Sequence, residues 1–133
     1  LFFQQETDRT NPGFLFPQYH SGDINAFHVS YFRRKEPEER VFHTCNLRKS
    51  CGFYLVAQGA DPIPGVEDVV DFYRLAVIKK ENRIEFTINE LSIFTYIDDG
   101  ITCGALLDGG KIGFRQLAPL TAEYRNLRVY QIK

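Results

Sequence analysis

Apolar and polar residues alternate along most of the chain from residue 24 onward, the pattern of strands in a sheet with one buried face. The alternation is clearest in residues 72–97, where three runs are separated by the turns Glu81-Asn82 and Asn89-Glu90. Runs joined by such short turns predict an antiparallel meander. Further strands are expected at residues 24–34, 41–47, 52–58, 111–116 and 122–132, with a short helical turn at residues 66–70.

The same pattern predicts the fold class. No run of 10 or more residues carries the apolar stripe of an amphipathic helix. About eight or nine short strands predict an all-β, antiparallel β-sandwich, and 133 residues suit one domain over residues 1–133. The chain opens on Leu1-Phe2-Phe3, apolar residues typical of the inside of a strand. We therefore expect the sandwich to lack its N-terminal strands, as the C-terminal part of a longer chain.

The amino-acid composition restricts the classes of binding partner that we expect. With 44% hydrophobic and 25% charged residues, the chain is typical of a soluble globular protein. The net charge of −1 leaves no basic surplus for phosphates, so a nucleic-acid partner is not expected. No apolar run approaches the roughly 20 residues that span a bilayer, so no membrane partner is expected either. Cys45, Cys51 and Cys103 lack metal or redox spacing. One disulfide stays open, but three free thiols in a reducing compartment are the simpler interpretation.

Two resemblances add to this picture. The C-terminal half of concanavalin A-like lectin and glucanase domains resembles residues 73–79, 84–89, 94, 98–99, 110–115 and 124–130. This likeness indicates a jelly-roll sandwich and little else. A more specific likeness covers nearly the whole chain from Tyr19. The bacterial YesU-like family of unknown function resembles residues 19–26, 28, 30–35, 38–40, 44–50, 59–62, 113–116 and 118–119.

The YesU-like resemblance implies a concanavalin A-like fold and a place in plant cell-wall polysaccharide utilisation, of the pectin or rhamnogalacturonan type. It supplies no established reaction. This chain departs from the family in lacking the N-terminal strands and in a shorter loop after Leu1-Phe2-Phe3. The implied role on imported oligosaccharides, together with unpaired thiols, favours a cytoplasmic location.

Candidate binding residues are polar side chains that alternate with core residues, because the outward face of a curved sheet can form a groove for sugars. His28 opposes the apolar face of Phe27 and Val29, as do Ser30 and Arg34. An ordinary solvated sheet face is the alternative.

The loop before this strand offers His20, Asp23 and Asn25 beside Gly22. Asp and Asn can bind sugar hydroxyls or ligate Ca²⁺, and they also make simple turns. The dense D-x-D pattern of a calcium loop is missing, so no cofactor or metal is expected, with Ca²⁺ left open.

Two arginines suit acidic sugars. Arg48, near Asn46, Lys49 and Ser50, presents a planar fork that matches a uronate carboxylate. Arg115 alternates against Ile112 and Phe114, which directs its side chain away from the core. The alternative for both is an ordinary surface arginine.

The sequence therefore predicts a carbohydrate-binding or carbohydrate-processing domain whose partner is an oligosaccharide or polysaccharide. One alternative is a lyase or glycoside hydrolase on oligosaccharides. The paired-carboxylate motif of glucanases is missing, since the acidic cluster at residues 67–71 has the wrong spacing. A lyase would need a base such as His28 or Tyr31, although Tyr31 is expected in the core with a partner for its phenol. A second alternative is a structural sandwich that forms homo-oligomers through its polar face.

Overall fold

The computed structural model describes residues 2–5, 25–32, 43–50, 52–63, 69–114 and 121–132, with the backbone alone for 2–5. Eight strands run through these residues, in agreement with the predicted all-β class. They are β1 (Phe2–Gln5), β2 (Ala26–Ser30), β3 (Thr44–Ser50), β4 (Tyr54–Ala60), β5 (Leu75–Lys80), β6 (Arg83–Ile88), β7 (Leu91–Ile97) and β8 (Lys111–Phe114).

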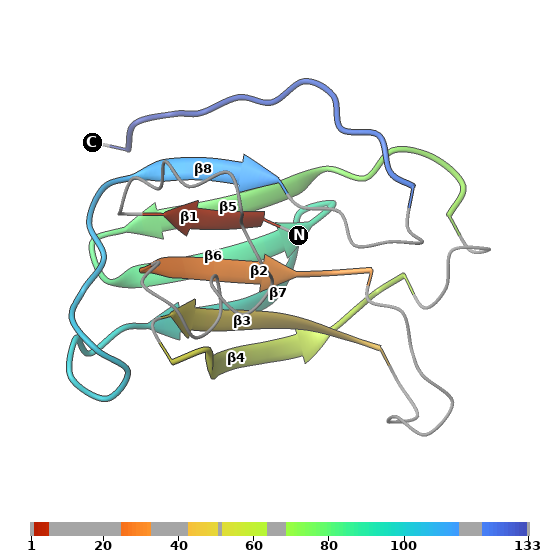
Figure 1. Ribbon diagram of the computed structural model, residues 1–133. Helices are drawn as coiled ribbons and strands as arrows, with labels where there is room; N and C mark the ends of the chain where they lie inside the picture. Colours follow the sequence, from red (N-terminus) through yellow and green to blue (C-terminus); the bar gives the residue numbers. More distant parts are fainter. Residues whose placement is uncertain are drawn as a thin grey trace.

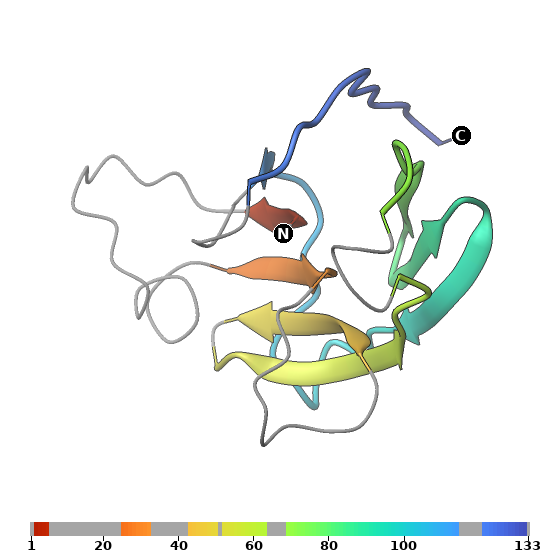
Figure 2. The same ribbon diagram turned by 90° about the vertical axis from the view of Figure 1, so that its right-hand side faces the viewer.

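The strands form two antiparallel sheets that face each other (Figures 1 and 2). The five-stranded sheet has the order β4-β3-β2-β1-β8, and the three-stranded sheet has the order β5-β6-β7. β1 lies between β2 and β8, with Phe3 opposite His28 on one side and Gly113 on the other. The predicted β-sandwich is confirmed.

The second sheet is the meander that the sequence predicts at residues 72–97. Both of its turns use the left-handed backbone conformation, at Glu81 (φ 52°) and at Asn89 and Glu90 (φ 47° and 70°). Two tight left-handed residues match the twist of paired strands, which fixes the β6–β7 hairpin. Asn89 also accepts a hydrogen bond on its side-chain oxygen from the Arg74 amide at 2.8 Å, which ties this turn to the residue before β5.

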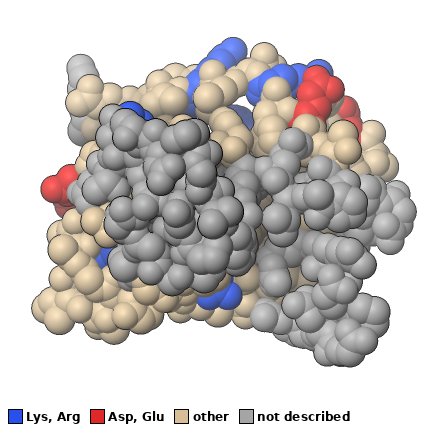
Figure 3. Space-filling model, viewed as in Figure 1, with Lys and Arg blue, Asp and Glu red and all other residues tan. Residues whose placement is uncertain are grey.

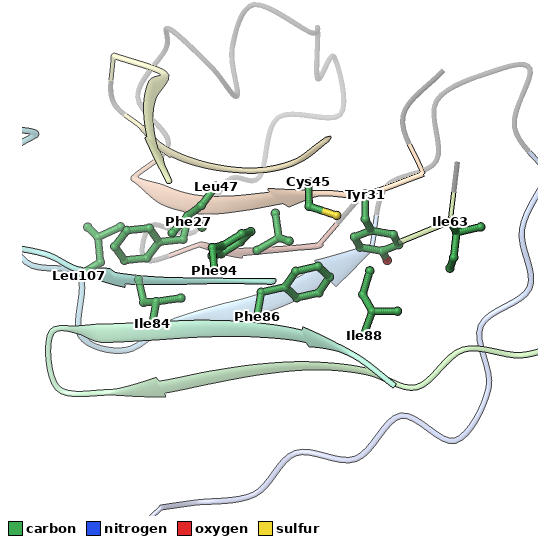
Figure 4. Close-up of a cluster of buried hydrophobic side chains, with 11 residues drawn as sticks. Phe27, Tyr31, Cys45, Leu47, Ile63, Ile84, Phe86, Ile88, Phe94 and Leu107 are labelled. Carbon is green, nitrogen blue, oxygen red and sulfur yellow. The ribbon is translucent and has the colours of Figure 1, made fainter. Parts of the chain in front are cut away.

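Apolar side chains from both sheets fill the space between them (Figure 4). Phe86 of β6 lies at the centre, with its ring 5.4 Å from that of Phe94 and 5.7 Å from that of Tyr31. The buried members of this core are Phe27, Val29, Tyr31, Cys45, Leu47, Ile63, Ile84, Phe86, Ile88, Phe94 and Leu107. Every second residue of β2 and β3 points into this layer, as the alternation predicts.

An ion pair also lies between the sheets. The Nζ of Lys49 is 2.7 Å from the Oδ2 of Asp98, and the two side chains are 1% and 2% exposed. Nζ donates a second hydrogen bond to the Gly104 carbonyl at 2.8 Å, and Asp98 Oδ1 accepts one from the Gly100 amide. The pair therefore joins β3 of one sheet to the loop that leaves β7 of the other.

Three sequence predictions need correction. Residues 122–132, expected as a strand, contain none. The strand expected at residues 41–47 runs through Ser50, so Arg48 and Lys49 lie within it. Val69 and Val70 are not helical, and the rest of the expected helical turn lies outside the described residues. Cys45 and Cys103 do not take part in a disulfide. Cys51 lies outside the described residues.

Candidate functional site

One face of the five-stranded sheet points away from the core, and we call it the outer face. It carries a group of polar side chains. Strand register places them in two rows across β2, β3 and β4. One row is Ser30, Asn46 and Gln58, and the other is His28, Arg48 and Leu55. In β2 and β3 the residue between the two rows points into the core. In β4 a register shift leaves both Val56 and Ala57 between Gln58 and Leu55, and both pack against the core.

In the first row, side chains of β3 and β4 form a hydrogen-bonded network. The Gln58 amide donates to Asn46 Oδ1 at 2.6 Å and approaches the Thr44 hydroxyl at 3.4 Å. The Thr44 hydroxyl donates in turn to Asn46 Oδ1 at 3.3 Å. Thr44 and Asn46 are buried, whereas Gln58 is exposed. The buried pair therefore orients an accessible amide.

In the second row, Arg48 and His28 both contact Phe53, which lies in the turn between β3 and β4. Arg48 Nη1 donates to the Phe53 carbonyl at 3.2 Å, and the guanidinium carbon lies 4.4 Å from the Phe53 ring centre. The His28 ring stacks on the same ring at 5.9 Å. Gly52 (φ 110°) and Phe53 (φ 55°) adopt left-handed conformations that turn the chain back and bring the aromatic ring over the sheet. Arg48 is thus held in place while partly exposed.

Three of the predicted site residues come together here, namely His28, Asn46 and Arg48. His28 and Asn46 lie on the predicted face, but only 5% and 2% of their surfaces are exposed. The polar side chains of the two rows that are at least partly exposed are Ser30, Arg48 and Gln58. Asn25 lies half-buried just before β2. His20, Asp23 and Arg115 fall outside the described residues, so their predicted roles stay predictions.

Tyr31 does not fit the role of a base. It lies in the core on the opposite side of β2 from His28, and its hydroxyl donates to that of Tyr124 at 3.4 Å. Burial, followed by the interaction with Tyr124, raises the pKa of the Tyr31 phenol far above its usual value. The expectation of a core position with a partner for the phenol is confirmed, and the use of Tyr31 as a base is wrong.

Sequence reasoning missed Gln58 and Phe53. The signal for Gln58 was present, because it is the polar residue that follows Val56 and Ala57 in a strand with an apolar side. Its partner Asn46 lies 12 residues away, and only the register of β3 against β4 brings the two amides together. Nothing local in the sequence indicates that Phe53 lies under Arg48.

Positive charge predominates among the described residues of the outer face. Among the described outer-face residues of β2, β3, β4 and β8, Arg48 and Lys111 are charged and carboxylates are lacking. In Figure 3, which views the molecule from this side, Lys and Arg side chains are seen along the upper edge, and Asp and Glu side chains at the upper right and the left margin. An anionic or hydroxyl-rich ligand matches such a face better than a cationic one.

The described residues lack two further features. No group of three or more His, Cys, Asp or Glu side chains within them is arranged to hold a metal ion. The same residues contain no helix long and apolar enough to cross a membrane. The possible Ca²⁺ site at Asp23 and Asn25 is untested, because Asp23 lies outside these residues.

Comparison with known proteins places the chain among relatives without an established activity. Uncharacterized protein YesU of Bacillus subtilis (strain 168) is 57% identical over 116 residues, which cover 87% of this chain and 53% of YesU. A crystal structure of a Bacillus subtilis protein of unknown function with a galectin-like fold matches with a TM-score of 0.79 at 50% identity. That match covers 89% of this chain and 58% of the other. The chain thus spans about half the length of these relatives.

These matches confirm the resemblance to YesU and the β-sandwich. The concanavalin A-like superfamily expected from the sequence agrees only coarsely with the galectin-like fold of the solved relative. A family model described as a domain of unknown function (DUF1961) matches residues 2–129. Because this match runs over nearly the whole chain, the protein belongs to the DUF1961 family.

Proposed function

We propose that the domain binds carbohydrate through the outer face of its five-stranded sheet. The observation that carries the proposal is the pair of cross-strand rows in which Gln58 and Arg48 are accessible, each held by buried or aromatic neighbours. The galectin-like fold of the solved relative supports it, since the fold is named after a class of lectins. Sites that hold their polar groups in advance lose less conformational entropy on binding.

The chemistry of these two groups suits a sugar acid. An amide such as that of Gln58 can both donate to and accept from hydroxyl groups. The Arg48 guanidinium presents a fork of donors that matches a carboxylate or two neighbouring hydroxyls. We propose a pectic or rhamnogalacturonan-type oligosaccharide as the ligand, with a uronate at Arg48. His28 and Asn46 would act behind the surface, by positioning Phe53 and Gln58.

Binding without turnover is the function that we favour. A retaining or inverting hydrolase needs two carboxyl groups across the scissile bond, and the described outer-face residues offer no such pair. A lyase needs a base near the neutralised carboxylate. Of the two bases that the sequence suggests, Tyr31 faces the other way with a raised pKa. His28 lies beside Arg48 but is only 5% exposed and stacks on Phe53. Self-association through the outer face is the remaining alternative from the sequence.

The test is a calorimetric titration of the chain with pectic and neutral oligosaccharides, followed by mass spectrometry of each mixture. We expect binding of an acidic oligosaccharide with its mass unchanged. Arg48→Ala should weaken the affinity roughly tenfold to a hundredfold, because a hydrogen bond to a charged group contributes about 1.5–3 kcal/mol. Gln58→Ala should have a smaller effect in the same direction.

Arg83→Ala is the matched control, because Arg83 is an exposed arginine of the other sheet, paired with Glu85 at 3.1 Å. Its affinity should equal that of the unchanged chain. If every oligosaccharide fails to bind, or if Arg48→Ala binds as well as Arg83→Ala, the proposal is wrong. A change in oligosaccharide mass would replace it with an enzymatic function. A dimer dissociated by Arg48→Ala would favour self-association.

A further inference from the structure

Strand β4, which lies beside β3 (Figure 1), carries a β-bulge next to Arg48. The register of the two strands shifts there, so that Arg48 pairs with Leu55 and Val56 is an extra residue in β4. Without the shift, Leu55 would pair with Lys49, whose side chain lies between the sheets. Bulges re-aim side chains and are common next to active sites. This bulge turns Leu55 to the outer face.

The outward position of Leu55 puts an aliphatic side chain into a row of polar ones. Leu55 is 47% exposed, and its neighbours across the strands in the same row are Arg48 and His28. A leucine turned from the core to water no longer contributes the free energy of its burial to the fold. Single exposed leucines are ordinary, but here the backbone departs from regular pairing to expose one. The side chain is therefore available to a ligand.

Leu55 and Arg48 form a defined pair on the outer face. They lie directly opposite each other in the ladder, where Cβ atoms are about 4.5–5.5 Å apart. The Arg48 guanidinium is held over the Phe53 ring, with its carbon 4.4 Å from the ring centre. A ligand that binds Arg48 therefore presents an adjoining group to Leu55.

The two side chains favour different groups of one ligand. A guanidinium favours a carboxylate. An aliphatic side chain favours a methyl group, because their contact removes apolar surface of both from water. It disfavours a hydroxymethyl group, whose hydroxyl would lose water without gaining a hydrogen bond. Among sugars, the 6-deoxy sugars carry a methyl group at the position where ordinary hexoses carry a hydroxymethyl group.

We propose that Leu55 is a specificity-determining residue of the outer face, which contacts the methyl group of a 6-deoxy sugar joined to the uronate at Arg48. This inference rests on the proposed carbohydrate binding and adds to it the sugar next to the uronate. The ligand is then an acidic oligosaccharide in which a uronate and a 6-deoxy sugar are neighbours, rather than one made of uronates alone.

The test compares two synthetic disaccharides that differ by one hydroxyl group. One is galacturonate linked to L-rhamnose, and the other is galacturonate linked in the same way to L-mannose, because L-rhamnose is 6-deoxy-L-mannose. In calorimetric titrations we expect the unchanged chain to bind the rhamnose compound about fourfold to tenfold more tightly, the effect of burying one or two methyl-sized groups. Leu55→Ala should make the two affinities equal.

Two further variants separate specificity from structure. Leu55→Met keeps an apolar side chain of similar size, so it should retain the preference for the rhamnose compound. Leu91→Ala is the matched control, because Leu91 is a 57% exposed leucine at the start of β7 in the other sheet, and it should retain both affinities. A merely structural role of Leu55 would weaken the binding of both disaccharides alike, so the ratio of the two affinities is the readout.

Equal affinities of the unchanged chain for the two disaccharides would overturn this inference and leave the proposed sugar binding intact. A preference that persists in Leu55→Ala would do the same. If the chain binds neither disaccharide nor any acidic oligosaccharide, the proposed function fails and this inference fails with it. Tighter binding of the monomethyl ester of digalacturonate than of the rhamnose compound would assign the methyl contact to an ester and overturn the choice of sugar.

Discussion

Arg48 and Lys49 are consecutive residues of β3 with the same charge, yet the sheet places them in opposite environments. Arg48 lies on the outer face, partly exposed, over the ring of Phe53. Lys49 lies between the sheets, 1% exposed, bonded to Asp98 and to the Gly104 carbonyl. Successive side chains of a strand point to opposite faces, which alone accounts for the difference.

The comparison teaches that position relative to the core, rather than residue type, decides what a charge contributes. A partly exposed cation keeps much of its hydration and loses little when its partner is removed. A buried cation has given up its hydration, so its partner carbonyl and carboxylate must replace all of it. Arg48 is therefore available to a ligand, whereas Lys49 holds β3 against the loop after β7.

The largest expected effect comes from removing one member of the buried pair. Asp98→Ala leaves the Lys49 ammonium between the sheets without its counter-charge, and it also removes the acceptor of the Gly100 amide. We expect the free energy of unfolding to fall by about 3–5 kcal/mol, measured by urea denaturation. Because the substitution lies on the core side, sugar affinity of the folded fraction should not change.

The double variant Lys49→Met/Asp98→Asn sharpens this comparison. It removes both charges together, and the asparagine oxygen can still accept from the Gly100 amide. Replacement of a buried ion pair by neutral residues is often close to neutral, so most of the lost stability should return. A double variant no more stable than Asp98→Ala would show that loop geometry, and not the unpaired charge, causes the loss.

A substitution of Asn46 tests whether a residue of the outer face also contributes to the stability of the fold. It lies on the same side of β3 as Arg48 but is 2% exposed, with its Oδ1 accepting from Gln58 and Thr44. Asn46→Ala leaves two donors without this acceptor, so we expect a loss of about 1–3 kcal/mol in urea denaturation. Gln58→Ala, at an exposed position of the same network, should cost less. Equal losses would contradict the division between a buried support and an accessible amide.

The meander and both of its turns were predictable from sequence, although its first strand begins at Leu75 and not at Phe72. The run expected at residues 91–97 is β7, and the turn at Asn89 and Glu90 lies where expected. Local signals suffice here, because hairpin partners are neighbours in sequence and the turn sets their register. The strand predicted at residues 122–132 is wrong for the opposite reason. Their alternation is as clear, but a strand also requires a partner, and local sequence does not say where that partner lies.

The sequence predicted which face of the sheet carries the candidate site, but it did not predict how deeply each side chain is buried. Alternation with Phe27 and Val29 correctly placed His28 on the outer face. The burial of His28 and Asn46 depends on how other segments pack over the strands, which alternation does not encode. The strand predicted at residues 41–47 ends before Lys49, although the alternation of Lys49 with Leu47 and Cys45 indicates the core side. Its partner Asp98 lies 49 residues away, beyond any local signal.

Arg48→Ala should have a small effect on stability beside its large effect on binding. The substitution removes one hydrogen bond to the Phe53 carbonyl and the contact with the Phe53 ring. We expect a loss of about 1–2 kcal/mol in urea denaturation, the combined magnitude of a partly exposed cation–π contact and one net hydrogen bond. Arg48→Lys keeps the charge without the fork, so it should retain stability but lose affinity for an acidic sugar. A loss of stability as large as that of Asp98→Ala would contradict the view that the outer-face charge contributes less to stability than the buried one.

The smallest effect concerns Asp99, the exposed neighbour of Asp98 in the loop that Lys49 anchors. Hydrogen bonds from the Thr102 hydroxyl and from the Ile101 and Thr102 amides lower the pKa of Asp99 from 3.8 to about 2. A carboxylate with a lowered pKa in the folded state stabilises the fold above about pH 4, and this contribution is lost as the pH falls toward 2. The stability difference between the unchanged chain and Asp99→Ala should therefore shrink over that interval. Thr102→Ala removes the largest cause, so in a carboxyl NMR titration the pKa of Asp99 should rise toward 3.8. An Asp99 pKa that does not respond to Thr102→Ala would mean that the loop is not held in this conformation, and that the Lys49 anchor acts on Asp98 alone.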